Sequence, residues 1–324
     1  MFTERPASPE LLLPTKLSFI FYYHAERHYP PNDPLFVLLE DHDLILTEVV
    51  GLPTKTRKDL ETKLNLVLHS QEGLTEDQIQ TKTDLITRLQ NSLDIDEQIA
   101  LRFAGTGKTI IFIDASEEDI KCLNLYGKGT MSQESITLAL ISGDVVEAQA
   151  NLALYAQTSV EEISFRNGLV VRQISDLSKA GACSGRKIAV LQGYLHSQTS
   201  GFLQTLLPQS QLQVHFLIPA ITPETKLVED LSLGRPVSES DYRLALLSDY
   251  ILLPALSAQT ETDDDLFLLI ELCSLVANLS NEQVELALNQ YSIVYRQNLT
   301  RLLGRKRHSS SKEKEAYAGF AYVQ

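Results

Sequence analysis

The residues whose types and spacing could do chemistry are concentrated in the stretch 187–207. Its order of residues predicts a buried strand, a short hydroxyl-rich turn and a helix, the layout that places a ligand at a helix N-terminus in an α/β fold. His196 could supply or remove a proton there and is the candidate catalytic residue. The candidate ligand-binding residues are Ser197, Thr199, Ser200 and Gly201. The alternative interpretation is that Thr199 or Ser200 only caps the helix.

A second motif, GTGKT at 105–109, ends like a phosphate-binding P-loop. The full pattern requires glycine where this chain has Arg102. The context is also inverted, because a P-loop leaves a strand and enters a helix, whereas this segment leaves a predicted helix and enters a predicted strand. We therefore interpret it as a glycine-rich turn, with Lys108 not bound to a nucleotide. Asp114, at the end of that strand, resembles a magnesium-binding acid that lacks its partner.

The densest group of metal-capable side chains is His24, Glu26, His28 and His42. Imidazole and carboxylate together suit zinc, iron or nickel. The order His-x-Glu-x-His differs from the helical motif H-E-x-x-H, and a polar loop beside a polar turn explains the same residues. We therefore predict no metal site, with these four residues as the alternative. The sequence does not identify a cofactor.

Bulk properties exclude several classes of protein. The 324 residues carry a net charge of −14, which opposes general nucleic-acid binding except through the basic segment 305–314. No apolar run reaches the roughly 18 residues of a membrane span, and the N-terminus has no secretion-signal pattern. Three scattered cysteines indicate neither a disulfide framework nor a metal-binding spacing. We expect a cytoplasmic protein.

The pattern of apolar residues predicts different architectures for the two halves of the chain. For the N-terminal half we expect helices at 54–68, from 75 onward and at 145–163, with strands at 16–23, 35–40, 44–50, 110–114, 120–126, 135–141 and 168–174. The pairs 35–40 with 44–50 and 110–114 with 120–126 would form hairpins. From 187 onward we expect parallel βαβ units with strands 187–194, 214–218 and 250–253, helices 200–207 and 239–247, and later helices 266–279 and 281–303.

The predicted fold class is therefore α/β, with an α+β N-terminal half and a Rossmann-like parallel sheet in the C-terminal half. We predict a mixed domain at 1–165, a Rossmann-like domain at 166–304 and a basic tail at 305–324. No complete catalytic signature is present. One hypothesis is a protein that binds an anionic small molecule, such as a nucleotide or sugar phosphate, as a transferase or hydrolase. The alternative is a non-enzymatic interaction or assembly subunit with a protein partner, and the sequence leaves both open.

Overall fold

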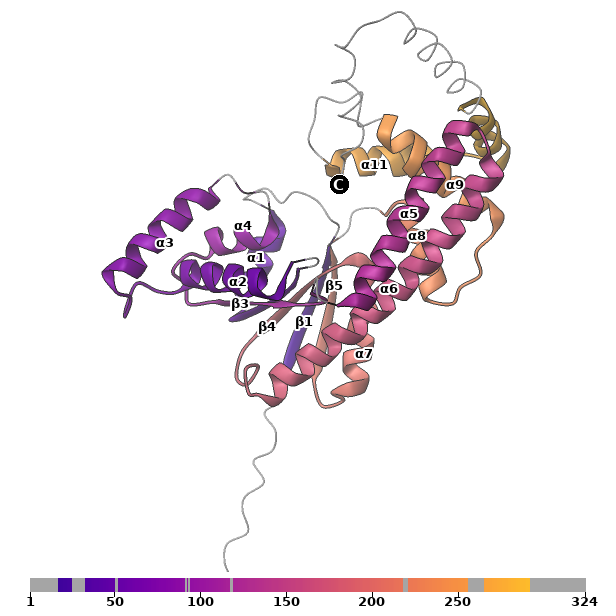
Figure 1. Cartoon of the computed structure of the whole chain (residues 1–324). Coiled ribbons are helices and arrows are strands. Elements are labelled where there is room, and N and C mark those ends of the chain that lie inside the picture. The colour runs from indigo at the N-terminus through magenta and orange to yellow at the C-terminus, as the bar shows by residue number, and fades with distance from the viewer. Residues whose placement is uncertain are drawn as a thin grey trace, which may run out of the picture. The chain divides into compact units, whose positions relative to one another are not determined.

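The computed structural model describes residues 17–24, 33–49, 52–90, 92, 94–116, 119–217, 221–255 and 265–291. The chain divides into two compact units (Figure 1). The first unit comprises 1–124, 161–219 and 264–266, and the second comprises 125–160, 220–263 and 267–324. Helices α5 (Ile120–Ser142) and α6 (Val145–Lys179) contribute residues to both units.

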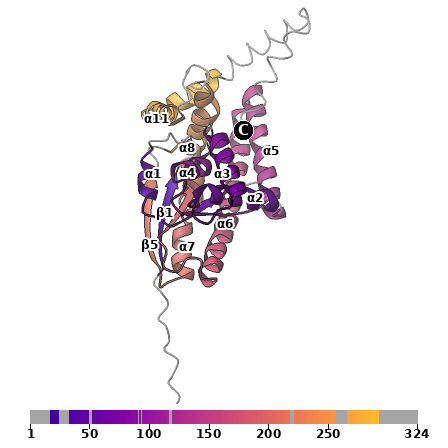
Figure 2. The ribbon, with the colours of Figure 1, turned by 90° about the vertical axis from the view of Figure 1, so that its left-hand side faces the viewer.

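The first unit is built on a sheet of five parallel strands in the order β3-β2-β4-β1-β5. The strands are β1 (Ser18–His24), β2 (Leu44–Glu48), β3 (Thr109–Ile113), β4 (Ile188–Gly193) and β5 (Gln211–Leu217). Every residue of the central strand β4 is buried, as expected for a parallel sheet that is covered on both faces. Figure 2 shows β1 and β5 side by side at one edge of the sheet.

Alternate residues of each strand face two different layers of helices, because successive side chains of a strand point to opposite faces. Phe19, Phe21 and Tyr23 of β1 pack with apolar residues of α6 and of α7 (Thr199–Leu206). Tyr22 instead belongs to the core of the other face. The helices of that face are α1 (Pro34–Leu39), α2 (Thr54–Leu68), α3 (Glu76–Leu89) and α4 (Ile95–Arg102).

The second unit is helical throughout its described residues. Besides parts of α5 and α6, it contains α8 (Pro223–Ser232), α9 (Glu239–Leu247), a π-helical turn η2 (Ser248–Leu252), most of α11 (Asp265–Val276) and a helix at 281–291. Ser280 caps the last helix, since its hydroxyl accepts from the main-chain N–H of Gln283 and the Gln283 side chain accepts from the Ser280 N–H. None of the described helices is long and apolar enough to cross a membrane.

The main correction concerns the fold class. The chain is an α/β protein, but the parallel sheet takes β1, β2 and β3 from the N-terminal half and is not confined to the C-terminal half. The predicted hairpin of 35–40 and 44–50 is wrong, because 34–39 is helix α1 and the neighbours of β2 are β3 and β4, both parallel. The helix start was visible locally: Asp33 accepts from the Leu35 N–H and Pro34 occupies the first turn.

Four other predicted strands are also helical. Residues 120–126 and 135–141 lie in α5, where Ile120, Leu123 and Leu138 are exposed although they are apolar. Apolar side chains on both the exposed and the buried sides of α5 obscure the helical period. Residues 168–174 continue α6 beyond its predicted end, and 250–253 lie largely in η2.

Most other elements agree with the sequence. The helices at 54–68 and 239–247 are confirmed, and α3 begins at the predicted capping box of Thr75 and Gln78. The strands predicted at 16–23, 110–114, 187–194 and 214–218 correspond to β1, β3, β4 and β5. The helix predicted at 281–303 is present to 291, and its remainder and the tail at 305–324 lie outside the described residues. The division into domains at 1–165 and 166–304 stays a prediction.

Candidate functional site

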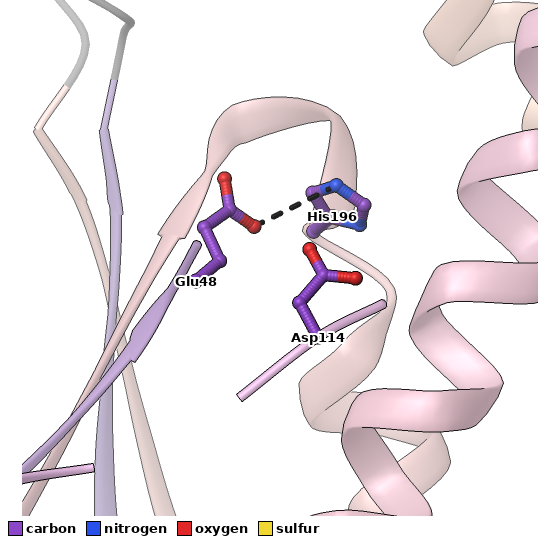
Figure 3. A group of neighbouring side chains, drawn as sticks. All are labelled: Glu48, Asp114 and His196. Atoms are coloured by element: carbon purple, nitrogen blue, oxygen red, sulfur yellow. Dashed lines mark ion pairs between the residues drawn. The ribbon is translucent and has the colours of Figure 1, made fainter. Parts of the chain in front are cut away.

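Three potential metal-ligand side chains from different parts of the sequence meet at the carboxyl edge of the sheet (Figure 3). Glu48 ends β2, Asp114 follows β3, and His196 ends the short 3-10 turn η1 (Tyr194–His196) after β4. One ligand-capable atom from each lies within 4.8 Å of the others. Because parallel strands end at the same edge, the strand order β3-β2-β4 brings these residues together, and such edges are where ligands of open α/β sheets bind.

Arg166 of α6 neutralises one of the two acids. Its Nη2 lies 2.5 Å from Asp114 Oδ2, and its Nε donates to both carboxylate oxygens at 3.1 and 3.0 Å. Burial alone would lower the pKa of Arg166, but the hydrogen bonds and charge of Asp114 raise it. Nη2 also lies 3.8 Å from Glu48 Oε2, and Nη1 lies 3.5 Å from Glu162 Oε1.

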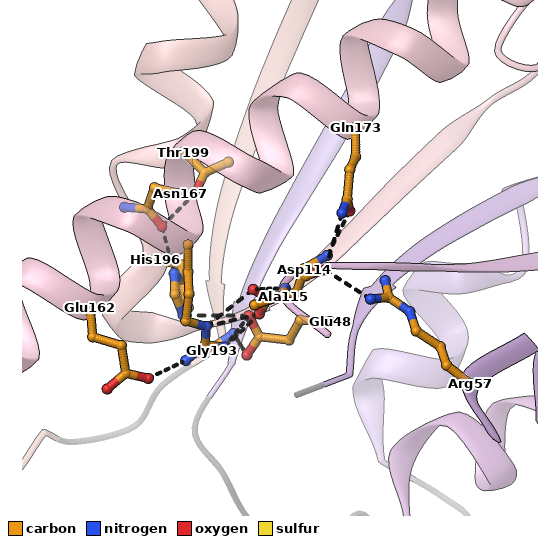
Figure 4. A network of polar contacts seen from close by, with 11 residues as sticks. Glu48, Arg57, Asp114, Ala115, Glu162, Asn167, Gln173, Gly193, His196 and Thr199 are labelled. Carbon is orange, nitrogen blue, oxygen red and sulfur yellow. Dashed lines mark hydrogen bonds and ion pairs between the residues drawn. The ribbon is translucent and has the colours of Figure 1, made fainter. Parts of the chain in front are cut away.

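The main chain of Asp114 is held in an unusual conformation. Its φ of 109° is the only positive φ of a non-glycine residue in the described chain. Gln173 accepts from its N–H at 2.8 Å and donates to its carbonyl oxygen at 3.1 Å, and Arg57 Nη1 donates to the same oxygen at 2.8 Å (Figure 4). Such strained residues persist where surrounding contacts hold them, and they are frequent at functional sites.

His196 is buried, and one partner fixes its tautomer. Its Nδ1 lies 2.5 Å from Asn167 Oδ1, which also accepts from the Thr199 hydroxyl at 3.1 Å. Because an amide oxygen only accepts, we infer that Nδ1 carries the proton and that Nε2 presents a lone pair. Nε2 faces Glu48 Oε2 at 3.6 Å, too far for a hydrogen bond. Burial lowers the pKa of His196 and so favours the neutral ring.

The two oxygens of Glu48 have different surroundings. Oε1 accepts from the Gly193 N–H at 2.8 Å, whereas Oε2 is buried and has no hydrogen-bond partner within the described chain. Burial raises the pKa of Glu48, while His196 and Arg166 counteract this effect. A Cβ at position 193 would lie 2.9 Å from Oε1, so any larger residue there would displace this carboxylate from its observed position.

The arrangement leaves two electron-pair donors facing each other, Glu48 Oε2 and His196 Nε2. A cation or a proton donor between these atoms would satisfy both. Asp114 is less available as a ligand, because Arg166 and the Ala115 N–H occupy its carboxylate oxygens. Glu48 and His196 are therefore the pair best able to bind a metal ion or activate water.

The predicted ligand-binding turn divides between this network and the surface. His196 and Thr199 point into the buried network, as Figure 4 shows. The N–H of Ser200 donates to the Tyr23 hydroxyl at 3.1 Å. Ser197 and Ser200 are half-buried and Gly201 is exposed. Helix α7 has Gln198 at its cap position without a side-chain capping bond, so the capping interpretation of Thr199 or Ser200 is wrong.

The predicted metal candidates do not form one cluster. His24 ends β1, and its main chain pairs with Gly193 at the same edge as the site. His42 precedes β2 at the opposite edge, where it is buried and lies edge-on to the Tyr22 ring at 5.7 Å. Glu26 and His28 lie outside the described residues.

The segment GTGKT at 105–109 is a structural turn between α4 and β3, as its context predicted. The Gly105 and Gly107 N–H groups donate to the carbonyl oxygens of Val67 and Leu68 at the end of α2. Lys108 Nζ donates to the main-chain oxygens of Glu40 and His42 at 2.6 Å each. These groups are therefore committed to contacts within the chain.

Sequence reasoning missed Glu48, Arg166 and Asn167. Asn167 lies in a stripe of buried positions on α6 that continues with Val170 and Ile174. A polar residue within such an apolar stripe is the signal that could have identified it. This stripe could be recognised only if 168–174 was assigned to the helix. The chain matches no protein-family model, no curated protein and no solved structure at a significant level of similarity.

Proposed function

We propose that this chain is a hydrolase that uses a divalent cation, held by Glu48 and His196 at the carboxyl edge of the sheet, to act on an anionic small molecule. The observation that carries the proposal is the approach of two buried electron-pair donors, Glu48 Oε2 and His196 Nε2, to 3.6 Å without a hydrogen bond between them. A cation bound to both atoms relieves their repulsion and lowers the pKa of a coordinated water.

The distance and the surroundings support a metal ion of the size of zinc. Two ligand atoms, each about 2.1 Å from such an ion in tetrahedral geometry, lie about 3.4 Å apart, close to the separation found here. Carboxylate and imidazole together suit zinc, iron and nickel. Asn167 accepts from Nδ1 of His196 and thereby orients Nε2, as partners of metal-binding histidines commonly do.

The proposed cation and a neighbouring cavity together support an anionic substrate. A cavity of about 350 Å³ adjoins Asp114, and its lining includes Arg57, Lys58 and Ser116. The same lining also contains the carboxylates of Glu61, Asp114 and Asp119, so Arg57 and Lys58 could contact an anionic group only where these acids leave them accessible. A divalent cation at Glu48 and His196 adds positive charge at the same edge. The predicted ligand contacts at Ser197, Ser200 and Gly201 remain part of this proposal.

Thermal unfolding with Zn²⁺, Mn²⁺, Ni²⁺ and Mg²⁺ added singly to chelator-treated protein tests the metal site. At least one cation should raise the midpoint of unfolding, because a ligand that binds only the folded state stabilises it. Glu48→Gln and His196→Asn should abolish this shift. Glu40→Gln removes an exposed carboxylate near the opposite edge and should leave it unchanged.

The hydrolase activity is tested with the cation that gives the largest shift. Phosphate esters and acidic carboxylic esters should be hydrolysed by the wild-type protein and the Glu40→Gln variant, but at least 100-fold more slowly by Glu48→Gln and His196→Asn. No shift with any cation, or equal shifts in all variants, would contradict the metal site. Proteins that co-purify with a chain lacking both cation binding and hydrolysis would instead favour the interaction-subunit hypothesis.

A further inference from the structure

The outer edge of the sheet at β5 is exposed and apolar. In this strand Val214 is 40% exposed and Phe216 is 57% exposed. The register pairs Val214 with Phe21, which places both on the face of the sheet covered by α6 and α7. On α7, Phe202 is 45% exposed and Leu206 is 51% exposed. Strand β5 and helix α7, which precedes it in the chain, therefore both expose large apolar side chains.

The other edge of the sheet, at β3, is closed by side chains of α2. Asn65 accepts from the Ile110 N–H at 2.8 Å and donates to the Ile110 carbonyl at 2.7 Å. Glu61 accepts from the Phe112 N–H at 2.8 Å. These contacts occupy main-chain groups that could otherwise pair with another strand.

The main chain of β5 has no such cover in the part of the chain that the structure describes. Gln211 donates its N–H to Leu17 on the β1 side. Because main-chain groups alternate in direction along a parallel strand, those of Leu212, Val214 and Phe216 point outward. We find no hydrogen-bond partner for these three residues among the described residues.

The segment that contains β5 and α7 has no acidic residue, lysine or arginine. No Asp, Glu, Lys or Arg occurs between Lys187 and Glu224, a segment that includes β4, α7 and β5. Exposed edge strands in soluble proteins are usually protected by charged residues, proline or a bulge, and β5 contains neither a charged residue nor proline. An edge without these protections favours pairing with another strand.

We propose that two copies of this chain associate through β5, in antiparallel orientation about a two-fold axis at Val214. This arrangement places Val214 opposite Val214 and Leu212 opposite Phe216, so that the outward main-chain groups of both copies form hydrogen-bonded pairs. Val214 and Phe216, together with Phe202 and Leu206, then form an apolar layer shared by the two copies. The two sheets become one sheet of ten strands, twice the five of one chain.

Two properties of this surface fit a second copy of the chain as its partner: its segment lacks charged residues, and in the antiparallel register it is complementary to itself. Each chain carries a net charge of −14, so two copies repel each other through most of their charged surface. An uncharged surface allows two acidic chains to meet with little repulsion. A two-fold interface also requires that the surface be complementary to itself, which the pairing of Leu212 with Phe216 fulfils. This proposal does not depend on the proposed hydrolase activity.

Sedimentation or light scattering of the full-length chain tests the association. The wild-type protein should have twice the 36.2 kDa mass of one chain. Val214→Lys places two lysines opposite each other at the axis and should give a monomer with an unchanged unfolding midpoint at low protein concentration. Leu138→Lys replaces a residue of α5 that is 65% exposed and should leave the dimer intact.

Cross-linking tests the register. In a background with Cys273→Ser, which removes the one native cysteine that is not buried, Val214→Cys should form a disulfide-linked dimer on mild oxidation. Its two Cα atoms would lie about 5.5 Å apart, within the range of a disulfide. Gln213→Cys, whose counterpart in the pair is His215, should not cross-link. A monomeric wild-type chain at every concentration, or a dimer unaffected by Val214→Lys, would overturn the proposal.

Discussion

Arg166 binds the carboxylate of Asp114 through Nε and Nη2, which lie 3.0 and 2.5 Å from Oδ2. The pair joins the long helix α6 to the residue that follows β3. The ion pair occupies the carboxylate of Asp114. Glu48 Oε2 and His196 Nε2 instead face each other at 3.6 Å with no hydrogen bond between them. Because of this ion pair, Asp114 is less available as a ligand than Glu48 and His196.

Replacement of Arg166 should strongly destabilise the chain. Arg166→Met leaves the carboxylate of Asp114 buried without its partner, so we expect the free energy of unfolding to fall by about 3–5 kcal/mol in urea denaturation. Arg172→Met removes an exposed arginine of the same helix and should change it by less than about 0.5 kcal/mol. Equal effects of the two substitutions would show that the pair contributes little to stability.

Gly193→Ala should damage the site through its size alone. The added Cβ would lie 2.9 Å from Glu48 Oε1, so the carboxylate must move away from the Gly193 N–H. We expect a loss of about 1–3 kcal/mol in stability and a smaller cation-induced shift of the unfolding midpoint. An unchanged shift in this variant would show that cation binding does not require the observed position of Glu48.

Gly201→Ala provides a contrasting test of the predicted ligand-binding turn. No atom lies within 4 Å of a Cβ at this helical position, so the substitution should stabilise the chain by up to about 1 kcal/mol. If a ligand approaches the main chain of Gly201 closely, its affinity should fall although stability rises. Titration of the variant with a hydrolysis product separates the two effects, and unchanged affinity would exclude a close approach.

Stability should fall as the pH rises from about 4.5 to about 7. Burial, with a smaller effect of Asp249, raises the pKa of Glu224 from 4.5 to about 7. The folded chain then keeps a proton that the unfolded chain loses, so the free energy of unfolding decreases across this window, by up to about 3 kcal/mol for one such group. Burial raises the pKa of Asp96 to about 7 as well, so Asp96 adds a further decrease in the free energy of unfolding as the pH rises.

Urea denaturation between pH 4.5 and 7.5 measures this dependence. Glu224→Gln should flatten part of the slope and Asp96→Asn another part, because each removes one titrating group. Glu282→Gln, at an exposed position, should leave the slope unchanged. A slope identical in all variants would contradict the assignment to Glu224 and Asp96.

Lys108→Ala should affect stability and not nucleotide binding. Lys108 Nζ donates to the main-chain oxygens of Glu40 and His42, so its removal should cost about 1 kcal/mol in urea denaturation. Lys63→Ala, at an exposed position of α2, is the control. Any shift of the unfolding midpoint by ATP or GTP should be equal in wild type and in Lys108→Ala. A shift lost only in the Lys108 variant would show that the segment 105–109 binds phosphate after all.

The sequence alone determined the elements whose signals are local. The capping residues Thr75 and Gln78 marked the start of α3, and the apolar runs in β1, β3 and β4 marked buried strands. The inverted context of the segment 105–109 identified it as a structural turn. These features are set by neighbouring residues, so they can be recognised without knowledge of the rest of the chain.

Only the tertiary structure decided which strands are neighbours and therefore which side chains form the site. The central strand β4 lies between β1 and β2, which precede it by more than a hundred residues, and no local pattern specifies such a pairing. His196 was recognisable as a polar residue after a buried strand. Its placement beside Glu48 and near Arg166 depends on the strand order and on the full length of α6, because contacts between distant segments arise from packing and not from local propensity.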